Sequence, residues 1–96
     1  MTLSALVVDD EQPAREELCF LLSQAGDVEV VGQADNGVAA LDMLEDLEPD
    51  VVFLDIQMPG LTGFEVARHA ALRQSSPHVV FVTAFDQYAV EIGRAH

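Results

Sequence analysis

The chain of 96 residues has no lysine, only one cysteine and no apolar run long enough to span a membrane. Four arginines stand against 17 acidic residues, which gives a net charge of -13. A chain this acidic lacks the basic surface that binds nucleic acid or an anionic membrane, so we expect neither as a direct partner. The lone Cys19 excludes an internal disulfide and suits a reducing compartment, which favours the cytoplasm.

Two classes of nucleotide-binding protein are also excluded. No glycine-rich phosphate motif follows any of the expected strands, so neither a dinucleotide-binding unit nor a P-loop is indicated. Repeats, linkers and low-complexity segments are absent from the sequence. The length therefore predicts a single domain over residues 1–96, and the 50% of hydrophobic residues are enough for a small core.

Apolar runs and segments with helical spacing alternate along the whole chain. This alternation predicts an α/β fold, in which a parallel sheet carries helices on both faces through right-handed crossovers. The third helix is expected to turn Phe64, Ala67, Ala70 and Ala71 inward, after an exposed loop over residues 58–62. The expected strands are residues 3–8, 28–32, 50–55 and 78–84.

Two of these strands are unbroken apolar runs that end in acid. Residues 51–54 lead directly into Asp55, and residues 6–8 lead into Asp9 and Asp10. A short apolar run without polar alternation is typical of a strand that is buried on both faces. Ligands bind at the carboxyl ends of the strands in open α/β sheets. We therefore expect the three carboxylates to share one pocket.

The chemistry of such a pocket points to a divalent cation and a phosphoryl group. Carboxylates repel one another, and hard oxygen ligands without a nearby histidine or cysteine favour Mg²⁺ or Mn²⁺. A metal held by few carboxylates keeps open positions for phosphate oxygens, and a carboxylate then acts as a nucleophile toward the phosphoryl group. Thr83 follows the last apolar run and is placed to donate its hydroxyl to a phosphoryl oxygen.

The chain has three short stretches whose combination is distinctive: Val7–Glu11, Phe53–Gly63 and Val82–Ala84. Through them nearly the whole chain resembles the receiver domain of bacterial two-component response regulators. The stretch Thr83–Ala89 further resembles the regulators that carry a LytTR-type DNA-binding domain after the receiver. The resemblance implies a flavodoxin-like, doubly wound parallel sheet with strand order 2-1-3-4-5, in which strands 1 and 3 are neighbours.

The resemblance also implies a role for each polar residue at the strand ends. Asp55 is then the phospho-accepting aspartate, so that the chain is a signalling acceptor and not an enzyme that turns over a substrate. Asp10, Asp55 and the backbone carbonyl of Gln57 ligate Mg²⁺, and Asp9 supports the metal through water. Thr83 supplies the switch hydroxyl that moves onto the phosphoryl group. The implied partner is a sensor histidine kinase.

The chain departs from the family pattern at its end. It stops at His96, before the fifth strand with its lysine and aromatic switch residue and before the fifth helix. We therefore expect a truncated receiver with strand order 2-1-3-4, in which DNA is reached only through a missing C-terminal domain. The apolar edge of the fourth strand, residues 79–82, is then expected to pair with another chain.

Two other functions compete with the phospho-accepting receiver. A phosphatase of the haloacid dehalogenase type also forms an aspartyl phosphate, but it requires Asp-x-Asp after its first strand, where this chain has Asp9-Asp10-Glu11. A degenerate or truncated receiver that acts only as a protein-interaction module is the second alternative. Phosphorylation by a small phosphodonor such as acetyl phosphate separates that module from a working receiver.

Overall fold

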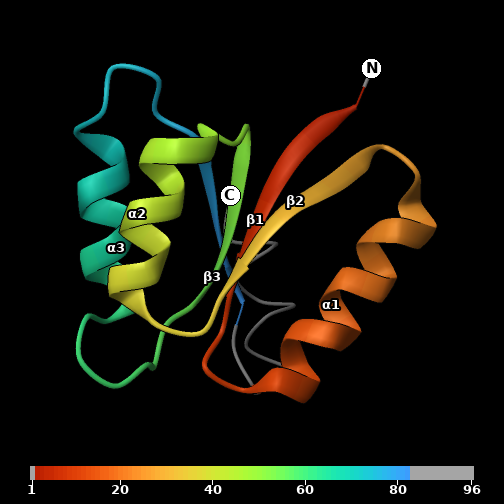
Figure 1. Cartoon of the computed structure of the whole chain (residues 1–96), viewed down its shortest axis with the longest axis horizontal. Helices are drawn as coiled ribbons and strands as arrows, with labels where there is room; N and C mark the ends of the chain where they lie inside the picture. The colour runs from red at the N-terminus through yellow and green to blue at the C-terminus, as the bar shows by residue number, and fades with distance from the viewer. Residues whose placement is uncertain (1, 83–96) are drawn as a thin grey trace.

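Four parallel strands form one sheet, in the order β2-β1-β3-β4, in a computed structural model that describes residues 2–82. Helix α1 covers one face of this sheet, and α2 and α3 lie side by side on the other face (Figure 1). The predicted α/β class and the order 2-1-3-4 are therefore confirmed. The elements are β1 Leu3–Val8, α1 Gln12–Ala25, β2 Val28–Ala34, α2 Gly37–Leu47, β3 Val51–Asp55, α3 Gly63–Ala71 and β4 His78–Val82.

Side-chain caps define where two of the three helices begin. α2 starts after Asn36, whose side-chain oxygen accepts a hydrogen bond from the N–H of Ala39 at 2.8 Å. α3 starts with a capping box, because Thr62 and Glu65 each accept a hydrogen bond from the other's backbone N–H. At the start of α1, Glu11 makes no such side-chain bond within the described residues.

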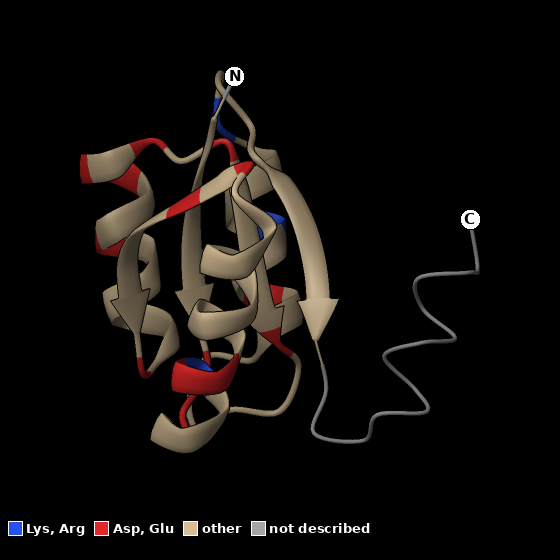
Figure 2. Ribbon diagram, turned by 90° about the vertical axis from the view of Figure 1, so that its right-hand side faces the viewer, with Lys and Arg blue, Asp and Glu red and all other residues tan. Residues whose placement is uncertain are grey.

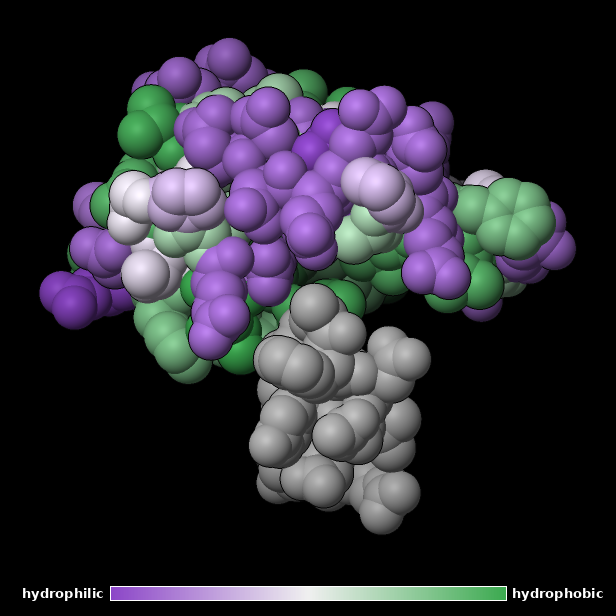
Figure 3. Space-filling model, turned by 90° about the horizontal axis from the view of Figure 1, so that it is seen from below, coloured by the Kyte–Doolittle hydropathy of each residue, from purple (hydrophilic) through white to green (hydrophobic). Residues whose placement is uncertain are grey.

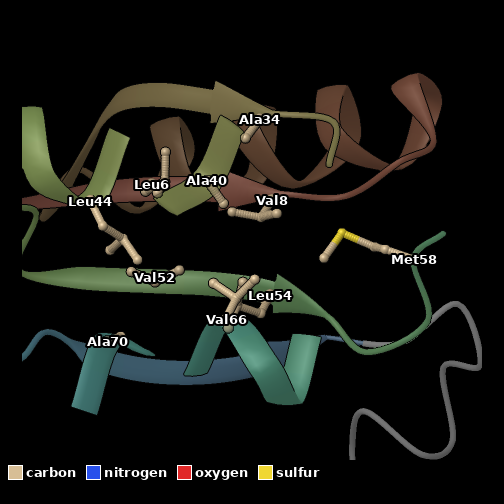
Figure 4. Packing of buried hydrophobic residues seen from close by; sticks show 10 residues of the cluster. All are labelled: Leu6, Val8, Ala34, Ala40, Leu44, Val52, Leu54, Met58, Val66 and Ala70. Carbon is tan, nitrogen blue, oxygen red and sulfur yellow. The ribbon is translucent and has the colours of Figure 1, made fainter. Parts of the chain in front are cut away.

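The main core lies between the sheet and the α2–α3 layer. Figure 4 shows side chains from β1 and β3 pointing toward those of α2 and α3. Fully burying a large aliphatic side chain stabilises a fold by about 1.5–3 kcal/mol. This packing fixes β1 and β3 together, and with them the ends of both strands. The buried cluster consists of Leu6, Val8, Ala34, Ala40, Leu44, Val52, Leu54, Met58, Val66 and Ala70.

The prediction for the inward face of α3 was partly wrong. Phe64 is 59% exposed and Ala71 is exposed, whereas Val66 and Ala70 are fully buried. Phe64 instead contacts Phe81 of β4, with the ring centroids 5.2 Å apart. All of residues 58–62 were also predicted to form an exposed loop, but Met58 is buried in the core.

Helix α1 packs loosely against the sheet. None of its residues is fully buried, and Phe20 and Leu21 are exposed. Leu18 and Cys19 are half-buried, and burial raises the pKa of the Cys19 thiol. Within the described residues the tighter helix packing is therefore under α2 and α3, although Ala5 and Val7 of β1 are also fully buried.

The strand β4 is paired on one side within residues 2–82. Its register with β3 runs from His78 opposite Val51 to Val82 opposite Asp55. Self-association through the other edge of β4 stays a prediction. None of the helices in this part of the chain combines the length and the apolar character needed to span a membrane.

Candidate metal centre

The strand register brings two acidic residues to one level of the sheet. Val8 of β1 pairs with Leu54 of β3, so the next residues, Asp9 and Asp55, stand side by side at the carboxyl ends of the two strands. The N–H of Asp9 donates to the carbonyl oxygen of Ala34 at 3.0 Å, which extends the β1–β2 pairing by one residue. The point where the strand order reverses is therefore the point where the acids emerge.

Three carboxylates gather at this point, from Asp9, Asp10 and Asp55. One oxygen atom of each lies within 4.8 Å of the others. Asp9 and Asp55 are half-buried, and Asp10 is exposed. Hydrophilic residues cover much of the described surface at this end of the molecule, toward which the strands point (Figure 3). Acidic residues also lie around the opposite end of the sheet (Figure 2). What distinguishes Asp9, Asp10 and Asp55 from these other acids is that their carboxylate oxygens lie close to one another.

Backbone N–H groups orient two of these carboxylates. The N–H of Glu11 donates to Oδ1 of Asp9 at 2.9 Å, and the N–H of Gln57 donates to Oδ1 of Asp55 at 3.4 Å. Each bond closes a short turn after its strand. Each also leaves the other carboxylate oxygen available to a ligand, because a carboxylate can accept several hydrogen bonds or metal contacts.

Of the three carboxyl groups in the cluster, that of Asp55 has a clearly shifted pKa. Burial raises the pKa of the Asp55 carboxyl from 3.8 to about 6, and the charge of Asp9 adds to this effect. The hydrogen bond from Gln57 opposes the shift, and Asp10 contributes a smaller increase. The negative form of Asp55 is thus less favoured in the folded chain than in a free carboxyl, and a positive charge that joins the cluster would favour it again.

The donor set fits a hard divalent cation. It consists of carboxylate oxygens from two neighbouring strand ends. The pKa of Asp55 is raised first by burial and then by the charge of Asp9, and a bound cation would offset both effects. The structure thus brings Asp9, Asp10 and Asp55 together, with the exposed Gln57 two residues after Asp55. Thr83 lies outside the described residues, so its place at the site stays a prediction.

Two residues beside the site were not among those predicted from the sequence to build it. Arg15 donates from Nη1 to the carbonyl oxygen of Asp9 at 2.9 Å. Gly63, the first residue of α3, donates its N–H to the carbonyl oxygen of Ile56 at 3.0 Å and packs against the backbone of Asp55. The available signals were an arginine six positions after Asp9 and a glycine that closes the motif around Asp55.

The fold and the acidic site together define a class of protein, and comparison with known families agrees. The family model described as the response regulator receiver domain matches residues 5–95. The chain belongs to this family, and it is a receiver domain of the two-component response regulator type.

Individual relatives and solved structures support the same assignment. An uncharacterised response regulatory protein of Vibrio parahaemolyticus is 56% identical over 93% of this chain. The sensory transduction protein LytT of Bacillus cereus is 47% identical over 93% of this chain. The chain spans 36% of the length of each of these two relatives. Among solved structures, the signal receiver domain of the NarL response regulator of Mycobacterium tuberculosis is 37% identical, with a TM-score of 0.77 over 95% of this chain and 77% of that one.

Proposed function

We propose that this receiver accepts a phosphoryl group on Asp55 and that Mg²⁺ supports the transfer. The observation that carries the proposal is the convergence of Asp9, Asp10 and Asp55 at the ends of β1 and β3, with oxygen atoms within 4.8 Å of one another. A half-buried carboxylate beside two others is suited both to bind a cation and to act as a nucleophile.

Each residue has a distinct part in the proposed transfer. An oxygen of Asp55 attacks phosphorus, and the bond from phosphorus to the imidazole nitrogen of the donor breaks, which leaves the electron pair on that nitrogen. Asp55 must be ionised to attack, and with a pKa of about 6 it is mostly ionised at neutral pH. Asp9, Asp10, Asp55 and the backbone carbonyl of Gln57 would hold Mg²⁺, which supplies positive charge for the phosphoryl oxygens when it is bound.

The proposed partners follow from the family. The donor is a sensor histidine kinase, and Thr83 supplies the hydroxyl that responds to the phosphoryl group. The output is transcriptional, through a LytTR-type domain elsewhere in the full protein, so this segment needs no nucleic-acid surface of its own. The place of action is the cytoplasm, and no small substrate is turned over.

The direct test is the intact mass of the chain after incubation with acetyl phosphate and Mg²⁺. We expect the wild type to gain the mass of one phosphoryl group, and Asp55→Asn to gain none because it lacks the nucleophilic oxygen. The matched control is Asp42→Asn, which removes one exposed acid from α2 and leaves the cluster intact. This control is expected to be modified like the wild type.

Two results would count against the proposal. Equal modification of wild type and Asp55→Asn would place the phosphoryl group on another residue. An unmodified wild type that still binds Mg²⁺ would favour the alternative, in which the domain acts only as a protein-interaction module.

A further inference from the structure

We propose that Arg15 is a positioning residue of the metal centre, which holds the loop between β1 and α1 so that the Asp10 carboxylate faces Asp55. This inference rests on the proposed function, because it assigns Arg15 a task in building the proposed cation site. Arg15 would touch neither the cation nor the phosphoryl group in this role.

The contact that carries the inference is a single charge-assisted hydrogen bond. Nη1 of Arg15 donates to the carbonyl oxygen of Asp9 at 2.9 Å in a partly buried setting. Hydrogen bonds with an ionised donor are shorter and stronger than neutral ones. Arg15 itself is anchored in the first turn of α1, where its N–H donates to the carbonyl oxygen of Glu11 at 3.1 Å. The side chain therefore ties the body of the helix back to the end of β1.

Peptide planarity carries this restraint on to Asp10. The carbonyl of Asp9 and the N–H of Asp10 belong to one rigid peptide unit, so fixing the oxygen also fixes the plane from which Asp10 departs. Asp10 is the exposed member of the cluster and gains little orientation from packing. Its direction toward Asp55 therefore depends on the backbone that presents it.

Few other contacts are available for this task among residues 2–82. Asp9 is held on the strand side through its N–H to Ala34, and its side chain accepts from the N–H of Glu11. Glu11 makes no side-chain cap at the start of α1. The Arg15 bond thus completes a set in which the N–H, the carbonyl and the side chain of Asp9 are all engaged.

If Arg15 acted through its charge alone, its removal would tighten Mg²⁺ binding, because a cation beside the cluster repels Mg²⁺. A positioning role predicts weaker binding when the hydrogen bond is lost, because the three carboxylates are then less well arranged. The sign of the change in the Kd for Mg²⁺ therefore separates the two roles.

The experiment compares Mg²⁺ titrations of Arg15→Met, Arg15→Lys and the wild type. Loss of a residue that orients a metal ligand typically weakens metal binding, so we expect Arg15→Met to raise the Kd for Mg²⁺ about 10-fold. Arg15→Lys keeps a charged donor of similar length and is expected to recover most of the affinity. Arg68→Met, which removes an exposed arginine from α3, is the charge-matched control and should bind like the wild type. If Arg15→Met does not fold, Arg15→Gln takes its place.

A second readout needs no metal. In amide spectra of the metal-free chain, Arg15→Met should shift the Asp10 signal while those of α2 and α3 stay in place. An unchanged or lower Kd in folded Arg15→Met, or an equal loss in Arg68→Met, would overturn the inference. A wild type that binds no Mg²⁺ would refute the proposed function. The metal-free spectrum would then decide the role of Arg15 alone, and an unshifted Asp10 signal would refute it.

Discussion

Replacing Gly63 with alanine is expected to destabilise the fold by about 2 kcal/mol, the usual range for a side chain forced into a packed site. A Cβ atom at this position would overlap the carbonyl oxygen of Asp55 and would lie 3.0 Å from Cα of Ile56. Both neighbours are backbone atoms, so no side chain can move aside. The helix or the end of β3 must shift, and the Asp55 carboxylate shifts with it. Chemical denaturation measures the loss of stability, and a Mg²⁺ titration of the same variant should show weaker binding.

Gly60→Ala, in the loop that precedes α3, is the matched control. Gly60 has a φ of 78°, but no atom lies within 4 Å of an added Cβ. Its cost is therefore backbone strain alone, about 1 kcal/mol, and its Mg²⁺ affinity should stay that of the wild type. If Gly63→Ala and Gly60→Ala have the same stability and the same Mg²⁺ affinity, the start of α3 does not pack as closely against the backbone of Asp55 as the structure indicates.

Asp55→Asn should abolish phosphorylation and make the metal-free chain more stable at neutral pH. Because the folded-state pKa of Asp55 is about 6 against 3.8 for a free carboxyl, folding favours the protonated form. The stability that this provides is present below pH 4 and is lost as the pH rises toward 6. Asparagine does not ionise and escapes this loss. We expect a gain of about 1 kcal/mol at pH 7, after allowance for the solvent screening of a partly exposed carboxyl.

Thermal melting of both proteins from pH 4 to pH 7.5 without metal measures this difference. The stability advantage of Asp55→Asn should be small at pH 4 and should grow up to about pH 6–7. Asp42→Asn removes the same charge from an exposed site and should show a much smaller pH dependence. A constant difference between wild type and Asp55→Asn across this range would mean that folding does not raise the pKa of Asp55.

The strands and their acidic ends could be predicted from sequence because two patterns coincide there. An apolar run without alternation predicts a buried parallel strand. An aspartate directly follows the last residue of β1, and another is the last residue of β3. Once the strand order is known, the acidic ends of β1 and β3 are expected to lie together, and Val8 lies opposite Leu54 in the structure. That order came from the family resemblance, since apolar runs alone do not say which strands are neighbours.

The helix faces were harder to predict. Alanine is a weak indicator of the buried face of a helix. The predicted inward face of α3 therefore included Phe64 and Ala71, which are exposed, and omitted Val66, which is buried. Residues 58–62 were predicted to form an exposed loop, yet the side chain of Met58 lies in the core. In both cases the tertiary packing overrides the local pattern.

Arg15 and Gly63 escaped sequence reasoning for a different reason. Each acts through the backbone of another residue: Arg15 on the carbonyl of Asp9, and Gly63 against the carbonyl of Asp55. Such contacts depend on where a loop turns, and neither hydrophobic period nor residue type encodes that directly. The sequence thus indicates the residues with the chemistry more readily than those that orient them.

The central claim is that one cation site exists where Asp9, Asp10 and Asp55 converge, on a chain that is acidic throughout. Paramagnetic broadening of amide signals by substoichiometric Mn²⁺ tests it most directly, because broadening falls steeply with distance from the ion. We predict that the amides of Asp10, Asp55 and Gln57 broaden first and that excess Mg²⁺ restores them. Broadening spread evenly over the acids of α2, or broadening that Mg²⁺ does not reverse, would contradict the claim.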